Sequence, residues 1–125
     1  MWNPNVEVKA FLIRLTRSKG GKSELFPFLN VLSWQENTQC FVHCLELDIV
    51  TDGDTPKSAM DNLAELLVEQ ISFGEKNHME IFHPAPREYW DKLYEIHTNR
   101  VRQYLLENSS RSRKEILSGL HLTNA

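Results

Sequence analysis

Residues 41–56, FVHCLELDIVTDGDTP, decide the fold of this chain. Apolar side chains recur on alternate positions through residues 40–50, which is the pattern of a half-buried β-strand. The alternation stops at a short acidic run, and Thr55 followed by Pro56 is typical of the N-cap and first position of a helix. The stretch therefore predicts a strand that leads through a turn into a helix.

Residues 57–73 carry an apolar stripe at helical spacing, and Gly74 follows them. The stripe consists of Met60, Leu63, Leu67 and Ile71. Glycine directly after the last periodic residue is a common end of a helix. We expect one amphipathic helix that packs on the sheet and ends at Gly74.

Two further strands are expected upstream. Residues 6–16 are rich in β-branched and aromatic side chains, and residues 29–34 are apolar. The polar residues 17–24 read as a loop, and residues 35–38 read as a turn that pairs the second strand with residues 40–50 as a hairpin.

The chain downstream of the first helix predicts a short strand and a longer helix. Residues 78–82 are the candidate strand, and residues 87–108 carry a second helical stripe with a surplus of aromatic residues. Residues 114–122 are expected to form a last short helix or a loose tail.

Together these elements predict an α+β fold. We expect a three-to-four-stranded antiparallel sheet with one packed helix, in the order β-β-β-α-β, followed by a C-terminal helical extension. Residues 1–84 would form the α+β domain, and residues 85–125 the extension, which is not an independent domain.

Length and composition narrow the class of protein. The chain has 125 residues, 41% of them hydrophobic and 25% charged, which suits a single domain with its own core. It has no apolar run of membrane-spanning length, no leader-like N-terminus and only two cysteines. These features predict a soluble cytoplasmic protein.

Charge is unevenly distributed along the chain. Residues 23–96 hold fourteen acidic and four basic residues, a net of −10, whereas residues 1–22 and 97–125 are basic. An acidic body would attract a basic protein partner. A solvated acidic surface is the plainer alternative.

Two motifs resemble a phosphate-binding loop and a metal site but lack the geometry that these sites need. The run 20–23, GGKS, resembles the end of a phosphate-binding loop, but Thr16 stands where the motif needs its first glycine. Cys40, His43 and Cys44 suggest a metal site, but a strand separates the two cysteines by about 13 Å and turns His43 to the other face. We expect neither a metal ion nor a cofactor, and His43 reads as a core residue.

The densest acidic group consists of Glu46, Asp48, Asp52 and Asp54. On one continuous strand, Glu46 and Asp48 would share a face about 7 Å apart. Such a face could be an ordinary polar surface or a docking site for lysine and arginine of a partner. It could also carry out acid–base catalysis together with His43. We expect no catalytic residue here and treat the four carboxylates as candidate partner-binding residues.

The same region resembles the HicB-like antitoxin family. The resemblance rests on residues 41–56 with Ala59, Asn62 and Leu63, and its centre is the turn Gly53-Asp54-Thr55 between strand and helix. It implies a partial RNase H-like sheet without nuclease activity. Gly53 is expected to hold a left-handed backbone conformation, and Asp54 or Thr55 to cap the helix before Pro56.

The resemblance also implies a function, namely docking and inhibition of a small basic RNA-cleaving toxin of the HicA type. A stand-alone homo-oligomeric regulatory or structural protein is the alternative. Its expected interface lies on the second helix and comprises Trp90, Tyr94, Val101, Tyr104 and Leu105. Nucleic-acid binding through basic residues near the C-terminus is a weaker alternative; those residues are Arg100, Arg102, Arg111, Arg113 and Lys114.

Overall fold

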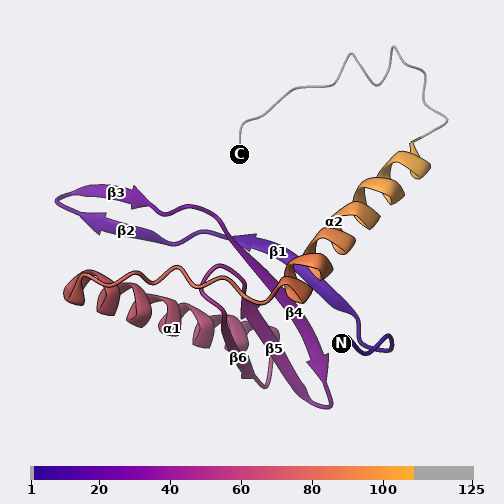
Figure 1. Ribbon diagram of the computed structural model, residues 1–125, viewed down its shortest axis with the longest axis horizontal. Coiled ribbons are helices and arrows are strands. Elements are labelled where there is room, and N and C mark those ends of the chain that lie inside the picture. The colour runs from indigo at the N-terminus through magenta and orange to yellow at the C-terminus, as the bar shows by residue number, and fades with distance from the viewer. Residues whose placement is uncertain (1, 109–125) are drawn as a thin grey trace, which may run out of the picture.

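The computed structural model describes residues 2–108 and has an α+β architecture (Figure 1). Six strands precede two helices. They are β1 (Val8–Ile13), β2 (Thr16–Lys19), β3 (Lys22–Leu25), β4 (Leu29–Glu36), β5 (Gln39–Cys44), β6 (Ile49–Gly53), α1 (Pro56–Asn77) and α2 (Arg87–Glu107). The tail predicted at residues 114–122 lies outside the described residues.

The central sheet has four antiparallel strands in the order β1-β4-β5-β6, and α1 packs against β5 and β6. The predicted α+β class is confirmed. The order of elements differs, because the fourth strand of the sheet is β6, which follows β5 directly, and not a strand after the first helix. Residues 78–82 are expected to be a strand, but His78 ends α1 and residues 79–82 belong to neither sheet.

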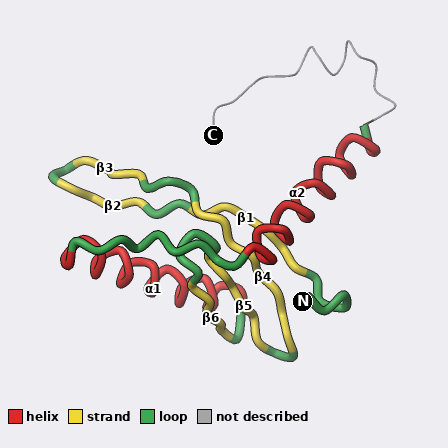
Figure 2. Tube along the Cα trace, in the orientation of Figure 1, coloured by secondary structure: helices red, strands yellow, loops and turns green. Residues whose placement is uncertain are grey.

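The loop predicted at residues 17–24 is wrong, because these residues form most of the β2–β3 hairpin. Its turn is Gly20-Gly21, with φ of 58° and 78°. Two successive positive φ values match the turn that best suits the right-handed twist of a two-residue hairpin, and glycine adopts them without steric cost. The hairpin projects beyond the main sheet (Figure 2).

The single strand predicted over residues 40–50 is also wrong. β5 ends at Cys44, residues 45–48 form a turn, and β6 runs back antiparallel to β5. Asp48 adopts a φ of 52°, a conformation that aspartate tolerates better than most residues. The alternating pattern runs through the turn unchanged, so periodicity alone could not reveal the reversal.

Helix α1 begins as predicted and ends later. The Thr55 hydroxyl accepts from the Ser58 N–H, the Ser58 hydroxyl accepts from the Thr55 N–H, and Pro56 starts the helix. The helix continues past Gly74 to Asn77, where left-handed His78 donates its N–H to the Gly74 carbonyl. Gly74 is instead a contact point, since an added Cβ would collide with the Ile81 side chain.

Apolar side chains form one core on each face of the sheet. The core under α1 contains both cysteines together with Val31, Val42, Ala59, Leu63 and Leu67. The thiols are free, and burial raises the pKa of Cys44. The opposite core is centred on Ala10, Leu32, Leu45 and Ala85. Both faces are covered, but by different helices.

The first half of α2 covers the second core, and its second half extends past the sheet (Figure 1). The Trp90 indole N–H donates to the Ala85 carbonyl at 3.1 Å, and Arg100 donates to the Ala10 carbonyl at 2.6 Å. Beyond Arg100 the described helix consists of exposed residues. Neither described helix combines the length and hydrophobicity that crossing a bilayer requires.

Gly53 does not hold the left-handed conformation expected of it, because its φ lies outside that region. Its role is steric. A Cβ at this position would lie 2.5 Å from the Ala59 backbone nitrogen and would also collide with the Ser58 hydroxyl. The absence of a side chain lets the end of β6 lie against the first turn of α1.

We therefore expect Gly53→Ala to destabilise the protein by about 1–3 kcal/mol, because the helix would have to move away from β6. The midpoint of urea unfolding, followed by circular dichroism, measures the effect. Gly20→Asn is the matched control, since Asn-Gly suits a two-residue turn of this type and nothing lies within 4 Å of the new Cβ. Equal midpoints for Gly53→Ala and the parent protein would refute the steric role.

Candidate partner-binding surfaces

Glu46 is occupied inside the protein. Its two carboxylate oxygens accept from the backbone N–H of Asn30 at 2.7 Å and from the Asn30 side-chain amide at 2.8 Å. The carboxylate thus holds the turn at residues 45–48 against the start of β4. Lysine or arginine of a partner would have to compete with both hydrogen bonds.

Asp48 is likewise engaged, with His43. The Asp48 carboxylate lies 2.7 Å from Nε2 of His43, whose side chain is 1% exposed. The imidazole stands edge-on to the Tyr89 ring of α2, with ring centroids 4.6 Å apart. His43 is the core residue that the sequence suggests, and Asp48 orients it.

The remaining two carboxylates belong to exposed residues, Asp52 in β6 and Asp54 on the connection from β6 to α1. Asp54 accepts a hydrogen bond from the side-chain amide of half-buried Gln39 at 3.2 Å. The predicted face shared by Glu46 and Asp48 is wrong, because both lie in a turn and each binds a different internal partner. Of the four predicted acidic residues, Asp52 and Asp54 are exposed, whereas Glu46 and Asp48 are half-buried.

The residues suspected of metal binding or catalysis are also separated. Cys40 and Cys44 lie in the core under α1, whereas His43 lies on the opposite face with Asp48. Within residues 2–108, no three histidine, cysteine, aspartate or glutamate side chains are placed to hold a metal ion. The Nδ1 atom of His43 is buried without a hydrogen-bond partner. Both observations place this imidazole in the core.

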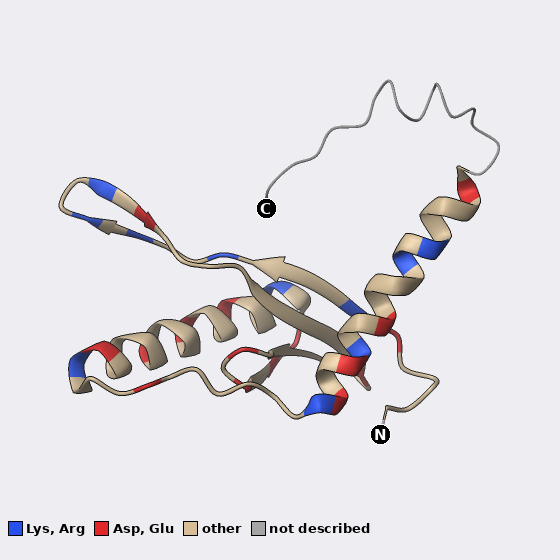
Figure 3. Cartoon of the chain, turned by 45° about the horizontal axis from the view of Figure 1, so that its top comes forward, with Lys and Arg blue, Asp and Glu red and all other residues tan. Residues whose placement is uncertain are grey.

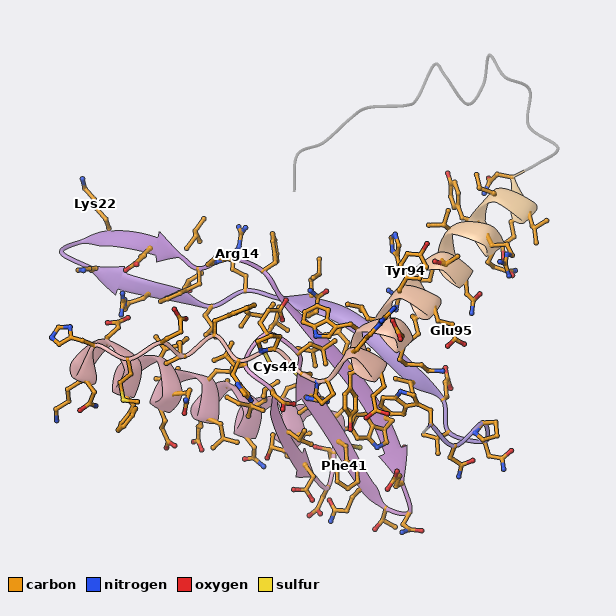
Figure 4. The ribbon with its side chains drawn as sticks, viewed as in Figure 1. Arg14, Lys22, Phe41, Cys44, Tyr94 and Glu95 are labelled. Carbon is orange, nitrogen blue, oxygen red and sulfur yellow. The ribbon has the colours of Figure 1, made fainter. Side chains whose placement is uncertain are left out.

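The predicted interface residues of α2 divide into two groups. Trp90 packs on the sheet of its own chain. The other four, Tyr94, Val101, Tyr104 and Leu105, are between 45% and 71% exposed. Tyr94 is labelled on α2 in Figure 4. A large apolar surface of this kind on a small domain is typical of a contact site.

A groove of about 770 Å³ runs between β1 and α2, beside these exposed residues. Its apolar walls are Phe11 and Leu12 of β1 and Trp90, Leu93 and Tyr94 of α2, and His97 and Arg100 also line it. The sequence predicts the wall of the groove that α2 forms, but it does not predict the contribution of Phe11 and Leu12. Both residues lie in an apolar strand, and nothing in the sequence indicates that this strand is at the sheet edge.

Comparisons of the chain with protein-family models, with curated proteins and with solved structures find no match. The interpretation of these surfaces therefore rests on their own geometry.

The Asp48–His43 contact generates a test of its structural role. Asp48→Gly keeps the left-handed backbone accessible but removes the acceptor, so we expect a loss of about 1–3 kcal/mol in unfolding free energy. Asp48→Asn retains both an acceptor oxygen and tolerance of a positive φ, so it should remain close to the parent. Urea unfolding measured by tryptophan fluorescence distinguishes them, and equal losses would show that the hydrogen bond is unimportant.

Proposed function

We propose that this protein is a non-catalytic, HicB-like binding module of the cytoplasm whose working unit is a homodimer formed through α2. The observation that carries the proposal is the joint presence, on one helix, of an apolar groove and an unpartnered apolar end. In a two-fold symmetric interface, both copies contribute the same surface. That surface must therefore carry both the groove and the apolar side chains that pack against it.

The spacing on α2 supports an antiparallel pair. Tyr94, His97, Val101 and Tyr104 follow one another at intervals of three, four and three residues, which forms a single seam along a helix. A two-fold axis beside Asn99 would set Tyr94 level with Tyr104 of the second copy. It would also set His97 level with Val101.

Replacing Val101 and Leu105 together by glutamate should convert the dimer to a monomer. Four buried carboxylates per dimer would weaken association at least about a hundredfold. Size-exclusion chromatography with light scattering gives the mass of each species. Val68→Glu is the matched control, since Val68 is comparably exposed but lies on α1. A monomeric parent protein, or a double variant that stays dimeric, would overturn the proposal.

A second candidate function is the inhibition of a small basic RNA-cleaving toxin. Its support is the acidic outer face of α1, where Asp61, Glu65 and Glu69 recur every fourth residue and all are exposed. Figure 3 shows acidic residues along this helix, and Asp52 and Asp54 lie just before its first turn. A surface of this charge would attract a basic partner.

The toxin hypothesis predicts that the protein purified from its native host carries a small basic ribonuclease at equal stoichiometry. Replacing Glu65 and Glu69 by lysine should release that partner and leave the homodimer intact. Light scattering with mass-spectrometric identification checks both statements. A homodimer that retains no second protein at low ionic strength would count against toxin binding.

A further inference from the structure

A second groove lies on the other face of the sheet, beneath the β2–β3 hairpin. Its volume is about 770 Å³, and it shares no lining residue with the groove beside α2. Its walls are residues 26–29, the second half of α1 and residues 78–82. Phe28, Met79 and Phe82 line it and are exposed, so an occupant of the groove must supply apolar side chains of its own.

The walls of this groove are held in place by specific contacts. Arg17 of β2 donates two hydrogen bonds, of 2.8 and 3.0 Å, to the Glu75 carboxylate of α1. On the other side, the Met79 N–H donates to the Gly74 carbonyl at 2.9 Å. A side chain at Gly74 would collide with Ile81, so glycine lets the segment after α1 lie against the helix. The groove is therefore formed without its occupant.

The charge of the lining is negative. Three glutamates line the groove, Glu46, Glu75 and Glu80, and no lysine or arginine of the described chain does. Arg17 forms an ion pair with Glu75 and offsets its charge. Glu46 accepts from the amides of Asn30, and Glu80 accepts from a backbone N–H. These donors are neutral and leave two negative charges, so the groove favours an occupant with basic as well as apolar side chains.

A segment of this composition is present in the chain itself, at residues 109–125. It has three basic residues and one acidic residue, namely Arg111, Arg113, Lys114 and Glu115. Its aliphatic residues follow toward the C-terminus and are Ile116, Leu117, Leu120 and Leu122. The basic part of the segment therefore comes before the apolar part.

The groove has the same order when it is followed from the end nearest α2. Figure 1 shows the segment after α1 running back beside that helix to the start of α2. Near this start, the His83 N–H donates to the Glu46 carbonyl at 3.0 Å. At the other end, Arg17 lies 5.2 Å from the Phe26 ring centroid and pairs with Glu75. The uncompensated charge of Glu46 thus lies nearest α2, and the apolar ring of Phe26 lies farther along the groove.

The end of α2 is far from the groove of its own chain. The helix has 21 residues, so its last residue lies about 31 Å from its first. The described chain ends there at Asn108, and Figure 1 shows this end of α2 pointing away from the sheet. At about 3.3 Å per extended residue, residues 109–117 would be used in returning to the start of α2. Ile116 and Leu117 would then not reach the groove.

A second copy brings the two parts together. In the antiparallel pair with its axis beside Asn99, Asn108 of one copy lies level with Trp90 of the other. Trp90 is in the first turn of α2, a few residues after His83 and the Glu46 end of the groove. Residues that follow Asn108 in one copy therefore begin beside the groove of the other copy.

From these observations we infer that residues 109–125 of one copy bind in the groove beneath the hairpin of the second copy, an inference that rests on the homodimer proposed above. The basic residues of the segment lie against Glu46 and Glu80. Its aliphatic residues pack on Phe26 and Ile71. The exchange occurs twice in each dimer, once for each groove.

Cross-linking of cysteine variants of the full-length protein tests the inference. One chain carries Pro27→Cys in the lining of the groove, and a second, differently tagged chain carries Ser118→Cys between two aliphatic residues. The two chains are co-expressed and treated with a flexible bismaleimide reagent, and the covalent heterodimer is quantified on a denaturing gel. The parent protein gives the background from Cys40 and Cys44, which are buried.

We expect at least ten times more covalent heterodimer than in a control pair that carries Val68→Cys instead of Pro27→Cys. Val68 is exposed on α1 and lies outside the groove. Adding Phe82→Lys to the chain with the groove cysteine should lower the yield at least tenfold, because it removes an apolar contact and repels the basic residues. Val50→Lys, on β6 and outside the groove, is its matched control and should leave the yield unchanged.

A yield no higher than that of the Val68→Cys pair, or a yield indifferent to Phe82→Lys, would overturn the inference. A link that forms only within one chain of the doubly substituted protein, Pro27→Cys with Ser118→Cys, would also overturn it. Light scattering of the untreated protein separates this result from the fate of the homodimer. A dimer without the cross-link refutes the exchange alone, whereas a monomer refutes both proposals.

Discussion

The turn at residues 45–48 is the constraint on which the rest of the structure depends. Leu45 donates its N–H to the Asn30 carbonyl at 2.9 Å and accepts the Ala85 N–H at 2.7 Å. The Glu46 carbonyl accepts the His83 N–H at 3.0 Å, and its carboxylate binds Asn30. Four residues thus connect the start of β4, the ladder of β5 and β6, and the segment that leads into α2. Leu45 and Ala85 are buried and the bonds between Glu46 and Asn30 are partly buried, so these hydrogen bonds would be costly to leave unmade.

The same turn decides where α2 lies. By reversing the chain it brings Asp48 back to His43, and His43 in turn supports Tyr89 at the start of the helix. Trp2 packs edge-on against Tyr89 from the other side. The beginning of α2 is therefore fixed on the sheet, while a helix of 21 residues is longer than the strands beneath it. The exposed apolar end and the groove beside β1 follow from this difference in length.

Local signals in the sequence predicted local structure well. Thr55 and Pro56 mark the start of α1, and the stripe through Trp90 and Leu93 marks α2, because capping and helical periodicity act within a few residues. The errors arose where partners are distant in sequence. Alternation carried the predicted strand through the turn after Cys44, since the reversal is stabilised by Asn30 and by residues 83–85. Gly74 looked like a helix end because Ile81, its packing partner, lies outside the helix.

The candidate surfaces likewise combine features that are visible in the sequence with features that depend on residues far apart in the chain. The exposed stripe of α2 is visible in its spacing, but the groove needs Phe11 and Leu12 from a strand some 80 residues earlier in the chain. The acidic group looked like a single patch because its members are close in sequence. In the fold, Glu46 and Asp48 face internal partners. Closeness along the chain shows that this stretch is acidic, but it does not predict which of the acidic side chains share a surface in the fold.

The two grooves have different consequences because they lie on opposite faces of the sheet. Pairing through α2 would cover the groove beside β1 in each copy and leave the groove beneath each hairpin open. The proposed dimer would then present two identical open grooves, one beneath each hairpin, to the two C-terminal segments. Dimerisation through α2 would in this way duplicate a surface that it does not touch.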